Sequence, residues 1–294
     1  MHAGNIYSAL VGWIDVRRQG GRVVLRIEDL DAQRSRAEFA DAVMRDFAFL
    51  GLWWDGEPLY QSDRMDAYLE AYGELSSQGL LYPCYCTRAD LHAASAPHVG
   101  EKPVYAGTCR MASPDVLEEK RAKAIEQGRG PSWRVLVPQR VVELSDRFQG
   151  RYEQDLQREC GDFVVRRSDG SFSYQLAVVV DDDYQGVTEV VRGVDLLSSA
   201  PQQRYLQDVL GLPHVAYGHV PLLMGPDGHR LSKRHRDANL ESLLDVYGTA
   251  EGILGHISYL AGIIPDDEPA TAQELLKYAD LSPLMHRKQI LWRQ

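Results

Sequence analysis

The chain has 294 residues, of which 44% are hydrophobic and 25% charged, and its formal net charge is −10. The composition is ordinary for a globular protein, and the length allows one large domain or two smaller ones. The acidic balance excludes a protein that coats nucleic acid non-specifically, because phosphate binding needs local Lys and Arg, although a small basic face could still hold an RNA. No apolar run approaches the ~20 residues that cross a bilayer and no signal peptide is evident, which predicts a cytoplasmic protein with no membrane partner.

The first part of the chain alternates between helical and strand-like patterns, as in an α/β domain with a parallel sheet. Apolar residues at helical spacing, glycines after the last turns and a capping box of Ser35 and Glu38 set the boundaries. In chain order these signals predict a helix over 2–18, a strand over 23–27, a helix over 35–51 and a helix over 62–79.

The pattern changes between residues 83 and 160, which we interpret as an insertion. This stretch contains three of the four cysteines, a polar helix near 114–128 and strand-like runs over 133–137 and 141–144. The α/β pattern returns over 161–238. It has strand-like runs at 163–166, 176–180 and 187–191 and a helix near 202–210. Residues 239–294 are helical in pattern.

Two segments have the residue types that bind phosphate. His2-Ala-Gly-Asn5 stands at the start of the first predicted helix, where free backbone N–H groups and the helix dipole attract anions, and Gly4 lets the backbone approach. Arg230-Leu-Ser-Lys-Arg234 follows a glycine-bounded loop and could place the Lys233 ammonium on a pyrophosphate. Either segment alone is a weak signal, because a chance N-terminal His or a solvated basic loop explains it as well.

Taken together, the two segments resemble the HIGH and KMSKS signatures of class I aminoacyl-tRNA synthetases. The segments between them are similar to motifs of the glutamate-activating branch of that family, and they occur in the same order. They are Leu25-Arg-Ile-Glu-Asp-Leu-Asp31, Gly161-Asp-Phe-Val-Val-Arg166, Tyr174 to Asp182, Gly186 to Gly193 and Tyr217 to Leu223. Within this branch the chain most resembles the glutamyl-Q tRNA(Asp) synthetase family, because only 60 residues follow Arg234 and Val178 stands where full-length enzymes more often have Asn.

The resemblance implies a Rossmann-type catalytic domain in two halves, 1–82 and 161–238, with an inserted zinc-containing subdomain over 83–160 and a helical region over 239–294. It also implies that the enzyme activates glutamate with ATP and Mg²⁺ and transfers it to queuosine in tRNA(Asp), as a monomer. His2, Asn5 and Lys233 are the implied catalytic residues. The implied ATP site contains His2, Gly4, Asn5, Arg230, Ser232 and Lys233.

Glu28, Tyr174 and Arg192 match the positions of the family's glutamate site. Glu28 suits the substrate ammonium, and the paired N–H groups of Arg192 suit its side-chain carboxylate. The alternative is a structural one, in which Glu28 pairs with Arg26 or Arg34, Arg192 pairs with Asp195 and Tyr174 fills the core. We also interpret Asp181 and Asp182, at the end of the apolar run 176–180, as carboxylates that end a strand and support the site.

Cys84-x-Cys86 and Tyr105-x3-Cys109 predict a metal site, because three thiolates suit tetrahedral zinc. A similar pattern in the glutamyl-Q family implies that Tyr105 is the fourth ligand of a structural zinc, although His92 or His98 could take this place. Cys160 is expected to be a buried apolar residue.

In the family a first strand precedes the His-x-Gly motif, and this sequence begins at that motif. Two explanations compete. The one we favour is a true start upstream of Met1, in a segment that supplies this strand. The other is a chain that begins here and lacks a central strand, which would expose unpaired backbone groups and apolar side chains. Two other functions stay open: a truncated glutamyl-tRNA synthetase, and a catalytically inactive RNA-binding protein that kept the fold.

Overall fold

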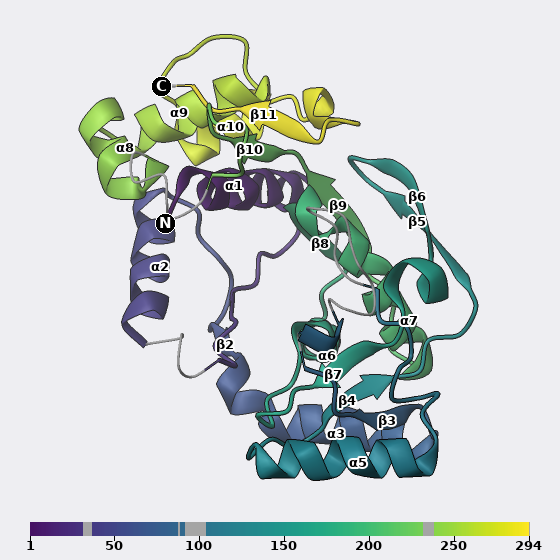
Figure 1. The fold of residues 1–294 in the computed structure, drawn as a ribbon. Coiled ribbons are helices and arrows are strands. Elements are labelled where there is room, and N and C mark those ends of the chain that lie inside the picture. The colour runs from purple at the N-terminus through teal and green to yellow at the C-terminus, as the bar shows by residue number, and fades with distance from the viewer. Residues whose placement is uncertain (32–36, 88, 92–103, 232–237, 294) are drawn as a thin grey trace.

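The computed structural model describes residues 1–31, 37–87, 89–91, 104–231 and 238–293. In these parts of the chain no helix is long and apolar enough to cross a membrane. The described chain has two main apolar cores, one around the first helix and one around the helices α6 (Tyr174–Tyr184) and α7 (Ala200–Val209). The two cores lie toward opposite ends of the ribbon in Figure 1.

Helix α1 (Ala3–Arg18) lies at the centre of the first core. Ile6, Leu10 and Ile14 are fully buried, and Gly12 allows α1 to approach the strand β8 (Glu189–Gly193), since a Cβ there would lie 3.4 Å from Val191. The same core contains the C-terminal helices α8 (Leu240–Tyr247), α9 (Ala250–Ala261) and α10 (Ala272–Tyr278). The helical prediction for residues 239–294 is therefore confirmed, except that β11 (Gln289–Leu291) forms a parallel pair with β10 (Leu222–Met224).

The largest sheet has four strands in the order β6-β5-β9-β8. Strands β8 (Glu189–Gly193) and β9 (Ala216–Val220) are parallel, and β5 (Val141–Asp146) joins β9 at a single pair, Asp146 and Tyr217. Strand β6 (Gly150–Asp155) forms a hairpin with β5. The hairpin comes from the predicted insertion, so the inserted residues extend the sheet of the predicted catalytic domain.

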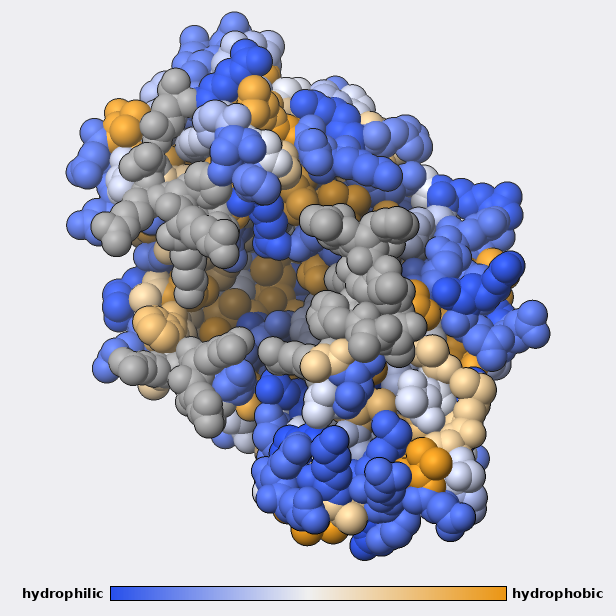
Figure 2. All heavy atoms as spheres, in the orientation of Figure 1, coloured by the Kyte–Doolittle hydropathy of each residue, from blue (hydrophilic) through white to orange (hydrophobic). Residues whose placement is uncertain are grey.

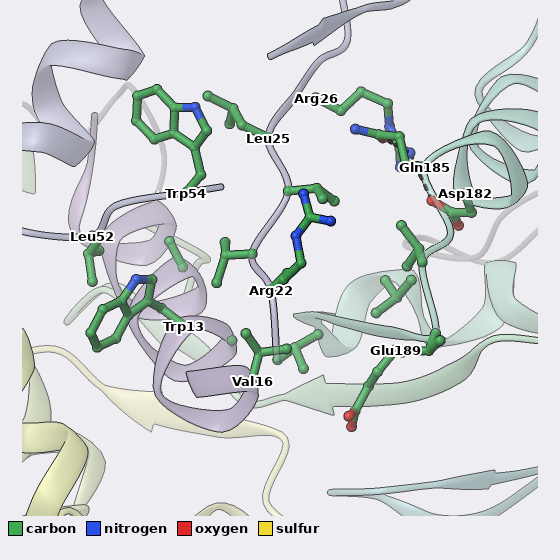
Figure 3. A pocket seen from close by; sticks show the side chains of 18 of the residues that line it. Trp13, Val16, Arg22, Leu25, Arg26, Leu52, Trp54, Asp182, Gln185 and Glu189 are labelled. Atoms are coloured by element: carbon green, nitrogen blue, oxygen red, sulfur yellow. Dashed lines mark hydrogen bonds and ion pairs between the residues drawn. The ribbon is translucent and has the colours of Figure 1, made fainter. Parts of the chain in front are cut away.

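The predicted strand over 23–27 is reduced to β1 (Arg26–Ile27), which pairs with β2 (Leu59–Tyr60) and not with β8. A groove of about 530 Å³ separates the segment 22–27 from β8, and its apolar lining opens on the face shown in Figure 2. Figure 3 shows Trp13, Leu52 and Trp54 on one side of the groove and Asp182, Gln185 and Glu189 on the other. Unpaired strand edges beside apolar side chains agree with the expectation of an interrupted sheet. That a segment before Met1 supplies a central strand stays a prediction.

The inserted residues form a second layer with a sheet of order β3-β4-β7. Its strands β3 (Leu81–Cys84), β4 (Ser132–Val135) and β7 (Phe163–Arg166) are antiparallel. Helices α3 (Met65–Ser77) and α5 (Pro114–Glu126) lie beside this sheet in Figure 1. Because β7 belongs to the second predicted catalytic half, the sheet crosses the predicted boundary at residue 160, and the domain limits stay a prediction.

The strand expected over 176–180 is wrong, because these residues belong to helix α6 (Tyr174–Tyr184). Leu176, Ala177 and Val179 are all buried in the second core, with α7 (Ala200–Val209) packed against α6. A helix buried on most sides has no polar stripe, so its short apolar run resembles a buried strand. Asp181 and Asp182 therefore lie within a helix and do not end a strand, contrary to the prediction. Helix α2 (Ala37–Phe49) is present as expected, but its predicted cap Ser35 lies outside the described residues.

Candidate active site

The first turn of α1 forms one wall of a pocket of about 240 Å³. Gly4 and Asn5 line this pocket, and a Cβ at Gly4 would lie 3.2 Å from the His2 imidazole, so the glycine makes room for that ring. His2 forms a backbone bridge to Asn239, at the start of α8. The start of α8 thus holds the His2 segment, since the Leu240 N–H also donates to the Met1 carbonyl at 2.9 Å.

The opposite wall comes from the ends of β8 and β10. Arg192 and Arg230 both line the pocket, and Arg230 forms an ion pair with Asp195 at its edge. A Cβ at Gly193 would lie 2.6 Å from an Asp195 carboxylate oxygen, so only glycine leaves room for that carboxylate. One pocket is therefore lined by residues of both predicted sites: Gly4, Asn5 and Arg230 from the ATP site, and Arg192 from the glutamate site. Ser232, Lys233 and Arg234 lie outside the described residues.

Arg192 is held by a set of uncharged groups. Its Nη2 donates to Gln203 Oε1 at 2.9 Å and to the Leu196 carbonyl at 3.4 Å, and its Nη1 donates to the Tyr174 hydroxyl at 3.2 Å. Its Nε donates to His219 Nε2 at 3.0 Å. Among the described residues no carboxylate lies within ion-pair distance of Arg192, so the alternative pair with Asp195 is wrong; Asp195 binds Arg230 instead.

This network leaves one N–H of Arg192 Nη1 next to Tyr174. Because the Tyr174 hydroxyl accepts a hydrogen bond from Nη1, its own proton is available to a second acceptor. Burial raises the pKa of Tyr174, so the hydroxyl stays protonated at neutral pH. Arg192 Nη1 and the Tyr174 hydroxyl therefore form a two-donor site for a carboxylate, in place of the paired guanidinium N–H groups that the residue type suggested.

Glu28 follows β1 and lies close enough to Arg26 and Arg192 for both charges to act on its carboxylate. Its side chain is 47% exposed, and one carboxylate oxygen lies 3.9 Å from Arg26 Nε. Nearby protein atoms still displace much of its water, and this desolvation raises the pKa of Glu28 against the opposing effect of Arg26. Arg26 itself binds Asp182 at 2.8 Å. The predicted structural pair with Arg26 is thus present but long, and the Glu28 carboxylate remains open to a cation.

Asp181 and Asp182 serve the site only as supports on α6. Asp181 is fully buried and accepts hydrogen bonds from Tyr68 of α3 at 2.6 Å and from Gln61 of the short 3₁₀ helix before it at 2.9 Å, which tie α6 to both elements. Asp182 holds Arg26, and desolvation raises its pKa. These contacts fix the relative positions of the elements that carry Tyr174 and Glu28.

The sequence did not single out Gln203 and His219. Gln203 is a polar residue that faces inward from an otherwise ordinary helix pattern, and only its burial at 2% exposure shows its role. His219 is part of the Tyr217 to Leu223 motif, so a buried histidine in that motif was the available signal.

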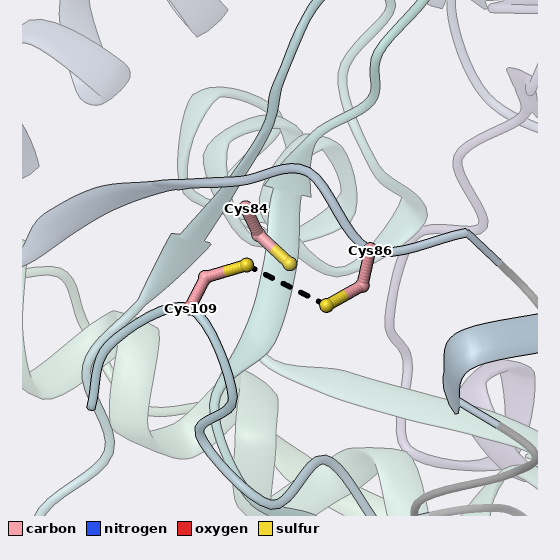
Figure 4. Close-up of side chains that lie close together, drawn as sticks. All are labelled: Cys84, Cys86 and Cys109. Carbon is pink, nitrogen blue, oxygen red and sulfur yellow. Dashed lines mark hydrogen bonds between the residues drawn. The ribbon is translucent and has the colours of Figure 1, made fainter. Parts of the chain in front are cut away.

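Three cysteines of the insertion lie together near the end of β3 (Figure 4). The sulfur atoms of Cys84, Cys86 and Cys109 all lie within 4.8 Å of one another, and those of Cys86 and Cys109 are 3.5 Å apart. Zinc with Zn–S bonds of about 2.3 Å requires S···S distances of about 3.8 Å in a tetrahedron. The donor set therefore fits a tetrahedral zinc ion with a small adjustment.

Tyr105 lies at the edge of this cluster. Its hydroxyl is 3.4 Å from Cys84 Sγ and accepts the Cys109 backbone N–H at 2.8 Å. Gly161 allows this position, because a Cβ there would lie 2.5 Å from the Tyr105 carbonyl oxygen. The competing ligands His92 and His98 lie outside the described residues. Cys160, expected to be buried, is only half-buried and packs beside the second core.

Comparisons with known proteins show the family to which the chain belongs. Residues 1–291 match the family described as tRNA synthetases class I (E and Q), catalytic domain. Glutamyl-Q tRNA(Asp) synthetase of Symbiobacterium thermophilum is 44% identical over 293 residues, which cover 96% of this chain and 89% of that protein. The protein of the same name from Nitratidesulfovibrio vulgaris is 41% identical over 284 residues, covering 93% and 86%.

Solved structures agree in fold. A glutamate tRNA ligase from Elizabethkingia meningosepticum, in complex with its amino acid, matches with a TM-score of 0.77 at 22% identity. A glutamate-tRNA synthetase from Elizabethkingia anophelis matches with a TM-score of 0.78 at 21% identity. The matches cover all of this chain but only 64% and 66% of the solved chains. The chain belongs to the class I tRNA synthetases of the glutamate and glutamine group and has their catalytic-domain fold.

Proposed function

We propose that the protein activates glutamate with ATP and transfers it to queuosine in tRNA(Asp). The observation that carries the proposal is the shared pocket, in which the N-terminal turn of α1 faces Arg192 and Arg230. Backbone N–H groups at a helix N-terminus attract phosphate, and an Arg beside them binds a carboxylate or a second phosphate. The relatives named glutamyl-Q tRNA(Asp) synthetase support the same substrates.

Glutamate would bind across Arg192, Tyr174 and Glu28. Its side-chain carboxylate would accept hydrogen bonds from Arg192 Nη1 and the Tyr174 hydroxyl, and its ammonium would face the Glu28 carboxylate. Its α-carboxylate would then point toward the pocket that Gly4 and Asn5 line.

Activation needs no protein nucleophile. An oxygen of the α-carboxylate attacks the α-phosphorus of ATP, the bond from that phosphorus to the bridging oxygen breaks, and pyrophosphate leaves. Asn5 and the first turn of α1 bind the phosphates, while Arg230, with Lys233 of the basic loop, neutralises charge on the leaving group. Mg²⁺ carried by ATP would add further charge neutralisation on the phosphates.

In the second step a hydroxyl of the queuosine cyclopentenediol attacks the carbonyl carbon of the glutamyl-adenylate. The hydroxyl loses its proton, an ester forms and AMP leaves. The cysteine cluster would hold a zinc ion through Cys84, Cys86, Cys109 and Tyr105. This zinc would be structural, because a site with four protein ligands has no open position for a substrate or water. A monomeric state and a cytoplasmic location belong to the same proposal.

Glutamate-dependent exchange of pyrophosphate into ATP tests the first step. We expect exchange with glutamate but not with glutamine or aspartate. Replacing Arg192 by Gln should reduce it about 10²-fold or more, since losing one partner of a buried charged contact commonly costs 2–5 kcal/mol. Arg151→Gln is the matched control, because Arg151 is 68% exposed on β6, away from the pocket.

Transfer of labelled glutamate to purified tRNA tests the second step. The proposal predicts labelling of tRNA(Asp) that contains queuosine and none of tRNA(Asp) that lacks it. Labelling of the 3′ end of tRNA(Glu) would instead support a truncated glutamyl-tRNA synthetase. Absence of pyrophosphate exchange from folded, zinc-loaded protein would support an inactive RNA-binding relative.

A further inference from the structure

Strands β8 and β9 place Arg192 opposite His219 as direct cross-strand partners. The His219 side chain is completely buried, and it stacks on Tyr217 with the ring centroids 5.8 Å apart. It therefore has no water to bind, and each of its ring nitrogens needs a partner within the protein.

Asp146, the last residue of β5, provides the first partner. One of its carboxylate oxygens lies 2.6 Å from His219 Nδ1. The other accepts backbone N–H groups of Phe148, Gln149 and His219 at 3.1, 2.9 and 3.0 Å. These hydrogen bonds lower the pKa of Asp146 despite its burial, so it remains a carboxylate and can only accept. His219 Nδ1 must therefore carry a proton.

Arg192 decides the state of the second nitrogen. Its Nε always carries a proton and donates to His219 Nε2 at 3.0 Å, so Nε2 must present a lone pair. The neutral Nδ1–H tautomer is the only state that satisfies both neighbours. A doubly protonated ring would place a donor against a donor and a positive charge beside the guanidinium.

We infer that His219 is a positioning residue for amino-acid binding: it accepts the Nε–H of Arg192 and so turns Nη1 toward Tyr174 and the substrate carboxylate. Three acceptors fix the rest of the guanidinium: Gln203, the Leu196 carbonyl and the Tyr174 hydroxyl. Without His219 the Nε–H of Arg192 has lost its acceptor, and the guanidinium is free to rotate about the side-chain bonds of Arg192. The inference rests on the proposed function in one respect, that Arg192 binds the glutamate side chain.

The arrangement also makes binding sensitive to acid. The charged or titratable groups that face His219 are Asp146 from β5, Arg192 from β8 and Tyr217 from its own strand. Burial and the Arg192 charge keep the pKa of His219 below its usual 6.5, so the ring is neutral at physiological pH. Once protonated, Nε2–H would compete with Arg192 for the Leu196 carbonyl and displace the guanidinium.

Two substitutions separate this role from simple packing. His219→Gln keeps an amide group at the place of Nε2 that can accept from Arg192, whereas His219→Asn keeps a donor to Asp146 and leaves Arg192 Nε without an acceptor. We expect the KM for glutamate in pyrophosphate exchange to rise about 10-fold or more in His219→Asn, and much less in His219→Gln. The KM for ATP should stay within about 2-fold in both.

A structural role of the Asp146–His219 contact would give the opposite order, with His219→Asn the milder change and both KM values altered alike. That result, or an unchanged glutamate KM in a folded His219→Asn protein, overturns the inference. A wild-type protein without glutamate-dependent exchange would overturn the proposed function first. If neither variant folds, the nitrogen chemical shifts of the His219 ring in the wild-type protein decide: the inference expects the neutral Nδ1–H tautomer at pH 7 with glutamate bound, and an Nε2–H tautomer or a doubly protonated ring overturns it.

Discussion

Asp15 is a buried carboxylate whose charge depends on pH. It lies on α1 at 1% exposure, accepts a hydrogen bond from Arg147 at 2.6 Å and has Glu189 nearby. Desolvation raises the pKa of Asp15 to about 6 against the opposing effect of Arg147, and Glu189 raises it further. The raised pKa means that the folded state binds this proton more tightly than the unfolded state. Protonation of Asp15 therefore adds fully to the free energy of unfolding below about pH 4, and this contribution is lost as the pH rises through about 6.

Replacing Asp15 by Asn should therefore leave stability nearly unchanged at pH 4 and raise it by about 2–3 kcal/mol above pH 6. Urea unfolding of both proteins from pH 4 to pH 8 measures the difference. Asp66→Asn, at an exposed position of α3, is the control and should show no such trend. If the Asp15→Asn protein is instead less stable than the wild type at pH 8, the ion pair with Arg147 outweighs the desolvation of the carboxylate.

A sequence motif identifies some residues of the site, whereas only the folded structure identifies their partners. Gly4 and Arg192 could be chosen from the sequence, because a motif carries them and their chemistry is local. The partner of Arg192 could not: the sequence suggested Asp195, three residues further on, whereas the structure pairs it with His219 and Gln203. Cross-strand pairing brings together residues 27 positions apart, and no local pattern reports it.

At the scale of elements, the groove between residues 22–27 and β8 has unpaired strand edges. The Leu25 carbonyl accepts the Leu59 N–H, and the Thr188 carbonyl accepts the Ala216 N–H, so these residues direct their backbone groups away from the groove. The residues that alternate with them along each strand direct their N–H and C=O groups into the groove. We expect the amides of Val24, Arg26 and Val191 to exchange at least ~10-fold faster than those of Val190 and Arg192, which face β9. Residue-resolved hydrogen exchange measures this ratio. Equal protection on both edges of β8 would mean that the groove edge is already hydrogen-bonded.

Elements with clear periodicity and end signals, such as α1 and α5, agree with their prediction to within two residues. Helix α6 does not, since burial on most sides removes the polar stripe by which a helix is recognised. Strand β11 was missed for a related reason. Three residues have no detectable alternation, and only pairing with β10 makes them a strand.

At the scale of the whole molecule, the cysteine cluster lies in the layer of β3, β4 and α5, which Figure 1 shows at the opposite end from α9 and β10. We expect about one zinc ion per chain by elemental analysis. Its removal by a chelator should lower the Tm by roughly 10 °C, because metal binding contributes directly to folding. Cys109→Ser should lose the ion.

Cys160→Ser is the control and should keep the zinc, since Cys160 lies outside the cluster. Tyr105→Phe tests the fourth ligand and should weaken zinc binding without abolishing it. Full zinc content in Cys109→Ser would contradict the assigned ligand set.

The sequence by itself determined the family and the α/β class, and it predicted that Cys84, Cys86 and Cys109 form one group, because each depends on residue types at fixed short spacing. The phosphate-binding roles of the two basic segments stay a prediction. Tertiary structure alone decided that β5 of the predicted insertion joins the sheet of β8 and β9, and that β7 of the predicted catalytic half joins the sheet of β3 and β4. It also decided that Arg192 is oriented by His219 and not by a carboxylate. The physical reason is that short motifs encode local chemistry. Sheet order and buried hydrogen-bond partners instead depend on which distant segments share a core, and that is settled only when the whole chain packs.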